Sequence, residues 1–444
     1  MKLTLARLVL ASLGAATLLA ACGGSNDTDT VLVGENRVDT QRADAPAMAA
    51  LGAYGVGVKT LNLVNRNQLD VVNARADGTT PTYDRPLAVE VWYPAGLAAG
   101  QTAAGTYQAM TRDGQTTVTL FGKAVRGASA DPSGGPYPLV ILSHGYPGNR
   151  FLLSHLGENL ASKGYVVASI DHTDSTYDAI RAFGSTLLNR SLDQLFVLNE
   201  MARLQAEDPD GTLKGLINAG NAAVIGYSMG GFGALNTVGA GFTAASVGFS
   251  YGTPNGALAV RQQGNPTYQA SLDSRIKAIV AIGPWGFNQG FWDAAGLAGV
   301  RTPVFFMAGS VDSTSGYAPG MRNLYEGTVN TQRYLLTFEN ANHNAAAPIP
   351  APQETRTLTC GTGTGAFACS AHYTDPVWDT VRMNNIAQHF ATAFLNKYLK
   401  ADPAMDSYLD LVPNAADGTG ATYWKGFGPN TAVGLRLEKR TAGQ

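Results

Sequence analysis

The sequence predicts an α/β protein with a mostly parallel central sheet flanked by helices. Short, fully apolar runs recur along the chain from Pro138 onward, as expected for strands that are covered on both faces. Stretches with helical periodicity separate these runs, and repeated βα units of this kind form parallel sheets. The 444 residues, 45% hydrophobic and 14% charged, suffice for one large domain with appendages.

The first 21 residues have the composition of an export signal. Lys2 and Arg7 give a positive start, and residues 8–21 form an apolar stretch too short to span a bilayer comfortably. The stretch ends in Leu-Ala-Ala before Cys22, which looks like a bacterial lipobox whose cysteine is lipidated; an ordinary secretory signal is the alternative. We therefore expect an extracytoplasmic protein anchored to a membrane through Cys22. Gly23, in place of an aspartate, favours the outer membrane.

The rest of the chain divides by composition into three parts. Residues 22–50 are small and polar, which predicts a flexible tether. Residues 51–400 contain the predicted sheet and end in a long amphipathic helix over 375–400. Residues 401–444, rich in Gly, Pro and Asn, are expected to pack on this domain as a C-terminal extension. The net charge of −2, without a basic face, gives no case for nucleic acid.

The apolar runs and periodic stretches give the expected elements in order. Strands are predicted over 138–142, 165–170, 222–225, 276–282, 303–307 and 334–338. Helices are predicted over 152–163, over 187–206 and from Met229 onward.

The most specific motif is Gly226-Tyr-Ser-Met-Gly230, in which Ser228 stands between a predicted strand and a predicted helix. Gly-x-Ser-x-Gly in this context is a nucleophile elbow, a turn so sharp that its flanking positions tolerate almost no side chain. The turn presents the serine hydroxyl beside a helix N-terminus, whose free N–H groups favour negative charge. Ser228 is therefore the predicted nucleophile.

A serine hydroxyl needs a base to take its proton and an acid to hold that base. With this elbow the acid and the histidine follow the serine, each just after a strand. Asp312 and His343 occupy these positions, and Glu339, four residues before the histidine, is the nearest competitor for the acid. Three of the six histidines precede Ser228, in the wrong order, and two lie beyond His343. We predict Asp312 as the acid and His343 as the base.

Two backbone amides should bind the negative oxygen of an acyl-transfer intermediate. One belongs to Met229, directly after the nucleophile. Tyr146, in the loop that follows an early strand, is the candidate for the other. His144 in the same loop, and His172, are catalytic residue types, but structural roles are favoured for both.

Aromatic residues near these positions suggest an acyl pocket. Trp285 follows the strand after the nucleophile helix, and core packing is its alternative role. With Tyr146 and Tyr227, Trp285 would favour a substrate with an apolar or aromatic acyl group.

Two cysteines remain if Cys22 carries lipid. Cys360 and Cys369 bound a short glycine-rich loop, and an extracytoplasmic compartment permits a disulfide between them. A metal site is the rival, but no histidine pairs with these cysteines at ligand spacing. We expect a disulfide, no metal and no cofactor.

Several segments also resemble a known family. Ser143-His-Gly-Tyr-Pro-Gly, residues 160–168, Asp171-His-Thr-Asp and the elbow resemble the platelet-activating-factor acetylhydrolase-like branch of the α/β-hydrolases. The elbow and Gly283-Pro-Trp are also similar to bacterial cutinase-type polyester hydrolases. The resemblance covers about residues 85–400. It implies an α/β-hydrolase fold and assigns the roles just described to Ser228, Asp312, His343, Tyr146, Met229 and Trp285.

Two segments depart from this resemblance, because residues 173–220 and 345–374 are longer than in the polyesterases and could cover the site. The patterns together predict a serine hydrolase that cleaves carboxylic esters, lipid-like, small or polymeric, through an acyl-serine intermediate. Amide or peptide hydrolysis by the same residues is the enzymatic alternative. A non-catalytic binding lipoprotein on a hydrolase scaffold is the alternative from another class.

Overall fold

The central feature of the structure is a ten-stranded sheet with the strand order β15-β12-β11-β10-β9-β7-β8-β3-β2-β6. The structure is a computed structural model that describes residues 35–98, 100–249, 253–418 and 423–444. Neighbouring strands from β12 to β8 run parallel, while β15 and β3 pair antiparallel with the two ends of this block. The strands are β2 (Gly55–Leu69), β3 (Thr82–Ala95), β6 (Val125–Arg126), β7 (Tyr137–Ser143), β8 (Val166–Ile170), β9 (Ile217–Tyr227), β10 (Ile276–Ile282), β11 (Val304–Gly309), β12 (Arg333–Phe338) and β15 (Leu435–Arg440).

Helices cover both faces of this sheet, which is why its central strands are mostly apolar. Every residue of β7 is buried, and successive side chains point to opposite faces. Val140 and Leu142 belong to one core, with residues of α1 and α8, whereas Leu139 and Ile141 belong to the other, with α2 and α3. The helices are α1 (Ser154–Ala161), α2 (Phe183–Glu207), α3 (Met229–Thr237), α4 (Ala244–Phe249), α5 (Pro266–Ala270), α6 (Ala294–Leu297), α7 (Asn323–Gly327), α8 (Thr380–Leu399) and α9 (Asp406–Leu409). The predicted α/β-hydrolase fold is confirmed.

Residues 36–50 differ from the predicted tether, because they pack on the domain. The strand β1 (Asn36–Arg37) pairs with β5 (Thr117–Gly122), which also pairs with β4 (Gly105–Met110) in a small second sheet. Val38 and Ala49 are buried. A few apolar side chains and backbone pairing suffice to hold such a polar segment in place. Cys22 and the rest of the expected signal and tether lie outside the described residues.

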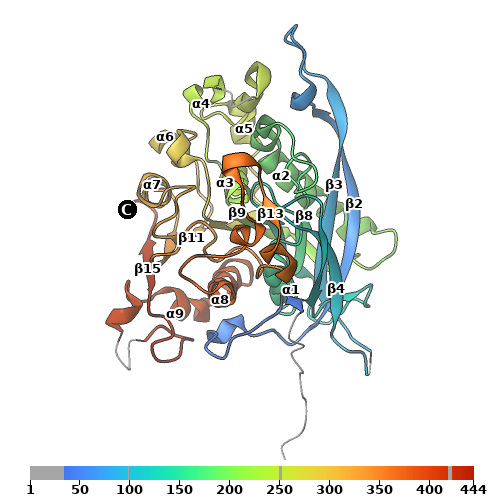
Figure 1. The fold of residues 1–444 in the computed structure, drawn as a ribbon, viewed down its shortest axis with the longest axis vertical. Coiled ribbons are helices and arrows are strands. Elements are labelled where there is room, and N and C mark those ends of the chain that lie inside the picture. The colour runs from blue at the N-terminus through green and yellow to red at the C-terminus, as the bar shows by residue number, and fades with distance from the viewer. Residues whose placement is uncertain (1–34, 99, 250–252, 419–422) are drawn as a thin grey trace, which may run out of the picture. The chain divides into compact units, whose positions relative to one another are not determined.

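The C-terminal extension does more than pack on the domain, because its last strand joins the main sheet. β15, drawn in red, lies at one edge of the sheet, and β2 and β3, in blue, lie at the other (Figure 1). Trp424 is 2% exposed, and its ring contacts that of Phe390 in α8 at 5.9 Å.

The closing helix begins later than the predicted residue 375. Asp379 caps α8, and its carboxylate accepts a hydrogen bond from the Arg382 N–H at 2.8 Å. Val377, expected on the apolar face of this helix, precedes it and is 63% exposed.

The segment before α8 contains the predicted disulfide. Cys360 and Cys369, with Cα atoms 5.0 Å apart, are bonded to each other, which confirms the expected pair. They stand at the two ends of a short hairpin, β13 (Thr359–Cys360) with β14 (Phe367–Ala368). In the part of the chain that the structure describes, no helix has the length and apolar character that a membrane span requires.

Candidate active site

Ser228 occupies the sharp turn between β9 and α3, with φ of 52° and ψ of −112°. A non-glycine residue in this region is strained, and such strain is common where a side chain must be presented to a substrate. The turn is fixed because the Ser228 N–H donates to the Ile282 carbonyl at 2.8 Å. A Cβ at position 226 would collide with the backbone of Gly230, and one at position 230 with the Ser143 carbonyl. The two glycines of the motif are therefore sterically required.

The structure brings Ser228, His343 and Asp312 together at the carboxyl ends of β9, β11 and β12. His343 Nε2 lies 3.0 Å from Ser228 Oγ, and His343 Nδ1 lies 2.9 Å from Asp312 Oδ2. The carboxylate can only accept, so Nδ1 carries the proton and Nε2 accepts from the serine hydroxyl. The three side chains thus have the connectivity of a nucleophile, its base and the orienting acid.

Asp312 is held in its ionised form by its surroundings. Burial alone would raise the pKa of this carboxyl. Hydrogen bonds from His343 and from the N–H groups of Ser315 and Thr314, both at 2.8 Å, outweigh burial and bring the pKa below its ordinary value. Glu339, the competitor considered for this position, is instead paired with Arg436, at 3.5 Å.

The loop that carries Tyr146 passes directly beside the nucleophile. A Cβ on Gly145 would lie 3.4 Å from the Ser228 Cβ. Met229 is the first residue of α3, where backbone N–H groups have no partner within the helix. Within the described residues, neither the Tyr146 N–H nor the Met229 N–H donates a hydrogen bond, so both remain available to an oxyanion.

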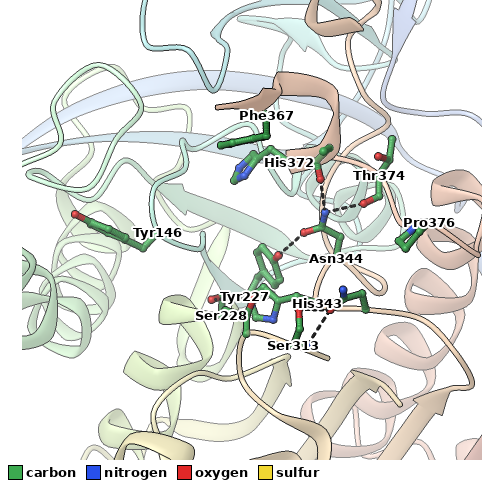
Figure 2. Close-up of a pocket in the computed structure, with 13 residues that line it drawn as sticks. Tyr146, Tyr227, Ser228, Ser313, His343, Asn344, Phe367, His372, Thr374 and Pro376 are labelled. Carbon is green, nitrogen blue, oxygen red and sulfur yellow. Dashed lines mark hydrogen bonds between the residues drawn. The ribbon is translucent and has the colours of Figure 1, made fainter. Parts of the chain in front are cut away.

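A cavity of about 560 Å³ opens over Ser228 and His343. In Figure 2, Phe367 and His372 lie above these two residues, and Tyr146 stands to one side. The residues that form the wall come from the Tyr146 loop, the elbow, the loops after β11 and β12, and the disulfide-bonded segment: Tyr146, Tyr227, Ser228, Ser313, Thr314, Asn342, His343, Asn344, Phe367, Ala371, His372, Thr374 and Pro376.

Asn344 ties the disulfide-bonded segment to the elbow and the catalytic histidine's loop. Its Nδ2 donates to the carbonyls of Ala371, at 3.0 Å, and Thr374, at 2.7 Å. Its Oδ1 accepts from the Tyr227 hydroxyl at 2.8 Å, as the dashed lines in Figure 2 show. The sequence prediction missed Asn344, although its position directly after His343 was a usable signal.

The two predicted pocket residues are placed differently. Tyr227 borders the cavity, and its ring lies 5.3 Å from that of His343. Trp285 stands one layer behind the wall, since its ring contacts Phe183 at 5.5 Å and Phe183 contacts Tyr146 at 4.9 Å. Trp285 therefore supports Tyr146 and is not itself among the residues that border the cavity.

His372 and Phe367 were not predicted as site residues, although the segment 345–374 that carries them was singled out as able to cover the site. His372 Nε2 is 2.9 Å from the Tyr177 hydroxyl, so the histidine is anchored at the cavity wall. Burial, together with the nearby Arg112 guanidinium, lowers the pKa of His372 to about 3. His372 is therefore a neutral wall residue at physiological pH.

Comparisons with known proteins agree with this geometry. The family described as platelet-activating factor acetylhydrolase, isoform II, matches residues 49–193, which include the Tyr146 loop. A cutinase from Thermobifida alba is 24% identical over 210 residues, 47% of this chain and 54% of the cutinase. Bis(hydroxyethyl) terephthalate hydrolase from Streptomyces coelicolor is 25% identical over 227 residues, 51% of this chain and 56% of that enzyme.

Platelet-activating factor acetylhydrolase from Cavia porcellus is 26% identical over 160 residues, 35% of this chain and 36% of that protein. The chain thus matches about half the length of its bacterial relatives. A solved ferulic acid esterase from Streptomyces cinnamoneus matches 84% of this chain over 96% of its own length, with a TM-score of 0.50 and 20% sequence identity. At this identity the match shows a similar fold and nothing further. The chain therefore has an α/β-hydrolase fold, and about half of its length is similar to esterases.

Proposed function

We propose that the chain hydrolyses carboxylic esters through an acyl intermediate on Ser228. One observation carries this proposal: Ser228 Oγ, strained at its elbow, lies 3.0 Å from a histidine that Asp312 orients, at the base of an open cavity. Relatives named cutinase, bis(hydroxyethyl) terephthalate hydrolase and platelet-activating factor acetylhydrolase support ester hydrolysis as the reaction.

The reaction follows from the positions of these groups. As Ser228 Oγ bonds to the ester carbonyl carbon, His343 Nε2 takes its proton, and the carbonyl electron pair moves to the oxygen. The N–H groups of Met229 and Tyr146 stabilise this oxyanion, and each such donor is worth roughly 10²- to 10³-fold in kcat. Asp312 stabilises the imidazolium.

Collapse of the tetrahedral intermediate breaks the bond to the alcohol oxygen, which receives the proton from His343. Water then replaces the alcohol and repeats the sequence on the acyl-enzyme, with His343 again as base, and releases the carboxylic acid. Apart from the ester and water, the chain supplies every reacting group of the two half-reactions.

The cavity indicates the kind of ester. Its wall combines the aromatic rings of Tyr146, Tyr227 and Phe367 with hydroxyl and amide groups, and none of the described residues that line it is an aspartate or a glutamate. Aromatic and apolar walls bind apolar or aromatic groups of a ligand. We therefore propose small or lipid-like esters with an apolar or aromatic acyl group. The disulfide-bonded segment forms part of the wall, so a polymer chain that enters the cavity would lie against Phe367.

A fluorophosphonate probe and a substrate panel test the proposal. We expect the probe to label the full chain once, at Ser228, and labelling to disappear in Ser228→Ala. p-Nitrophenyl esters of rising chain length, a p-nitrophenyl benzoate and a phospholipid should define the acyl preference, with a p-nitroanilide of the best acid as the amide control. A wild-type chain that takes no label and hydrolyses no ester would overturn the proposal, whereas faster cleavage of the anilide than of the ester would reassign the activity to amides.

We also propose export and lipid attachment at Cys22, with an outer-membrane location. The Leu-Ala-Ala-Cys sequence and the disulfide, which persists in oxidising compartments, support this. In a Gram-negative host, labelled palmitate should be incorporated into the wild-type chain and not into Cys22→Ser. Equal incorporation into both would exclude lipidation at Cys22.

A further inference from the structure

Behind the Tyr146 loop lies a second Ser–His–Asp chain that the proposed reaction does not use. Ser143 Oγ is 2.8 Å from His172 Nε2, and His172 Nδ1 is 2.9 Å from Asp193 Oδ2. Ser143 ends β7, His172 follows β8, and Asp193 lies in α2. All three residues are at most 1% exposed, so no substrate reaches them.

This second chain is a fixed charge arrangement. Arg85 donates to both carboxylate oxygens of Asp193, at 2.8 and 2.9 Å. Burial would raise the pKa of Asp193, but Arg85 and His172 outweigh it and lower the pKa to about 2. Burial lowers the pKa of His172 to about 3. His172 is thus neutral, with its proton on Nδ1, and the Ser143 hydroxyl donates to Nε2.

Next to this arrangement, Arg190 of α2 donates to the backbone of the Tyr146 loop. Its guanidinium lies 2.5 Å from the His144 carbonyl and 3.4 Å from the Gly145 carbonyl, and it donates to Ser175 Oγ at 2.8 Å. Arg190 is 1% exposed and, among the described residues, forms no ion pair with a carboxylate. Burying a cation without a paired anion costs stability. We therefore expect a buried arginine that donates to two backbone carbonyls to have a function that offsets this cost.

The ring of His144 acts on the same peptide group. Its Nε2 accepts from the His172 N–H at 3.2 Å, so the proton is on Nδ1, which donates to the Gly145 carbonyl at 2.7 Å. The Gly145 carbonyl and the Tyr146 N–H belong to one peptide unit. Donors on the carbonyl draw electron density from the amide and strengthen its N–H as a donor, because linked hydrogen bonds polarise one another.

We propose that Arg190 and His144 are positioning residues that fix and polarise the Gly145–Tyr146 peptide, so that its N–H is aimed at the oxyanion before the reaction begins. The buried Ser143–His172–Asp193 chain, held by Arg85, keeps the His144 ring in the required tautomer and orientation. The inference rests on the proposed function, because it takes Tyr146 as an oxyanion donor. A donor that is already oriented needs no reorganisation when negative charge develops.

Arg190→Met tests this, with Arg333→Met as a matched control. Arg333 is also fully buried and also donates to backbone carbonyls, among them that of Tyr325 at 2.5 Å, but it lies at the opposite end of β12 from the site. We expect Arg190→Met to lower kcat for a p-nitrophenyl ester by about 10-fold or more, with KM within about twofold. Arg333→Met should lower Tm and leave kcat unchanged.

Two further variants keep the test decisive if Arg190→Met does not fold. Arg190→Lys retains a cation and should recover part of kcat. His144→Leu removes the Nδ1 donor to Gly145, together with the Nε2 acceptor of the His172 N–H, and should lower kcat with KM unchanged. The inference is overturned if folded Arg190 and His144 variants keep wild-type kcat, or if Arg333→Met loses as much kcat as Arg190→Met. An inactive wild-type protein would instead overturn the proposed function, so the two failures are distinguishable.

Discussion

The molecule contains two Ser–His–Asp chains of nearly equal dimensions. We name them the accessible chain (Ser228, His343, Asp312) and the buried chain (Ser143, His172, Asp193). Their hydroxyl-to-imidazole distances are 3.0 and 2.8 Å, and their imidazole-to-carboxylate distances are both 2.9 Å. The hydrogen-bond geometry of a catalytic triad therefore does not by itself identify a catalytic site.

What separates the two chains is their surroundings. Ser228 has a strained backbone and opens into the cavity, whereas Ser143 is the last residue of a strand and is completely buried. Free N–H groups lie beside Ser228, where a developing oxyanion would sit. The acid of the accessible chain is held by backbone N–H groups, and the acid of the buried chain is held by Arg85. We propose that the accessible chain serves the chemistry and that the buried chain supports the loop that assists it.

Removing each of the two serines in turn should give the largest difference in kcat between the accessible chain and the buried chain. Ser228→Ala should lower kcat by roughly 10⁶-fold, the loss expected when a triad nucleophile is removed. Ser143→Ala should keep kcat within about 10-fold, because only an orienting bond is lost, and should cost about 1 kcal/mol of unfolding free energy. Hydrolysis of p-nitrophenyl acetate and urea unfolding measure the two effects. A folded Ser143→Ala as inactive as Ser228→Ala would contradict the comparison.

Amide substitution of the two acids should separate activity from stability. Asp312→Asn should lower kcat by about 10⁴-fold, because the amide favours the wrong histidine tautomer. Asp193→Asn removes one of the two carboxylates paired with the buried Arg85 and leaves only Asp174, so it should lower the free energy of unfolding by about 3–5 kcal/mol. Initial-rate kinetics of both variants measure kcat, and their thermal unfolding measures the change in stability. The opposite pattern would mean that the roles of the two chains are exchanged.

Acid should destabilise the protein through its buried histidines, of which His172 is one. Burial lowers the pKa of His155, His172 and His389 to about 3, whereas an unfolded histidine titrates near its ordinary value. Between these pH values the unfolded state binds more protons, so the free energy of unfolding falls as the pH falls through and below about 6.5. Between pH 8 and pH 5, each such histidine lowers the free energy of unfolding by about 2 kcal/mol.

His155→Leu isolates one of these contributions. Neither ring nitrogen of His155 has a hydrogen-bond partner within the described residues, so the substitution removes a proton site without removing a bond. Urea unfolding at the two pH values should show a smaller acid loss in His155→Leu than in the wild type. An unchanged loss would mean that His155 does not titrate on unfolding as its burial implies.

The sequence was sufficient for the accessible chain but not for the buried one. Ser228, Asp312 and His343 each follow a recognisable apolar strand, and parallel strands bring their carboxyl ends to one edge. The partners Arg190 and Asp193 lie within the predicted helix 187–206, where charged residues ordinarily face solvent. Nothing in the periodicity of that helix indicates that α2 turns them inward, because their burial depends on tertiary packing.

The substitution with the smallest expected effect changes only how the substrate is bound in the cavity above the accessible chain. Phe367, 37% exposed on its disulfide-bonded hairpin, borders the cavity and belongs to neither chain. Phe367→Ala should raise KM for an aromatic ester such as p-nitrophenyl benzoate by roughly 5-fold, the size of about 1 kcal/mol of aromatic contact. kcat for the acetate should not change. Phe367→Leu keeps an apolar side chain, so its KM for the benzoate should lie between those of the wild type and Phe367→Ala. Because this wall acts only by touching the substrate, an equal loss of kcat for acetate and benzoate would show that the hairpin supports the reacting groups themselves.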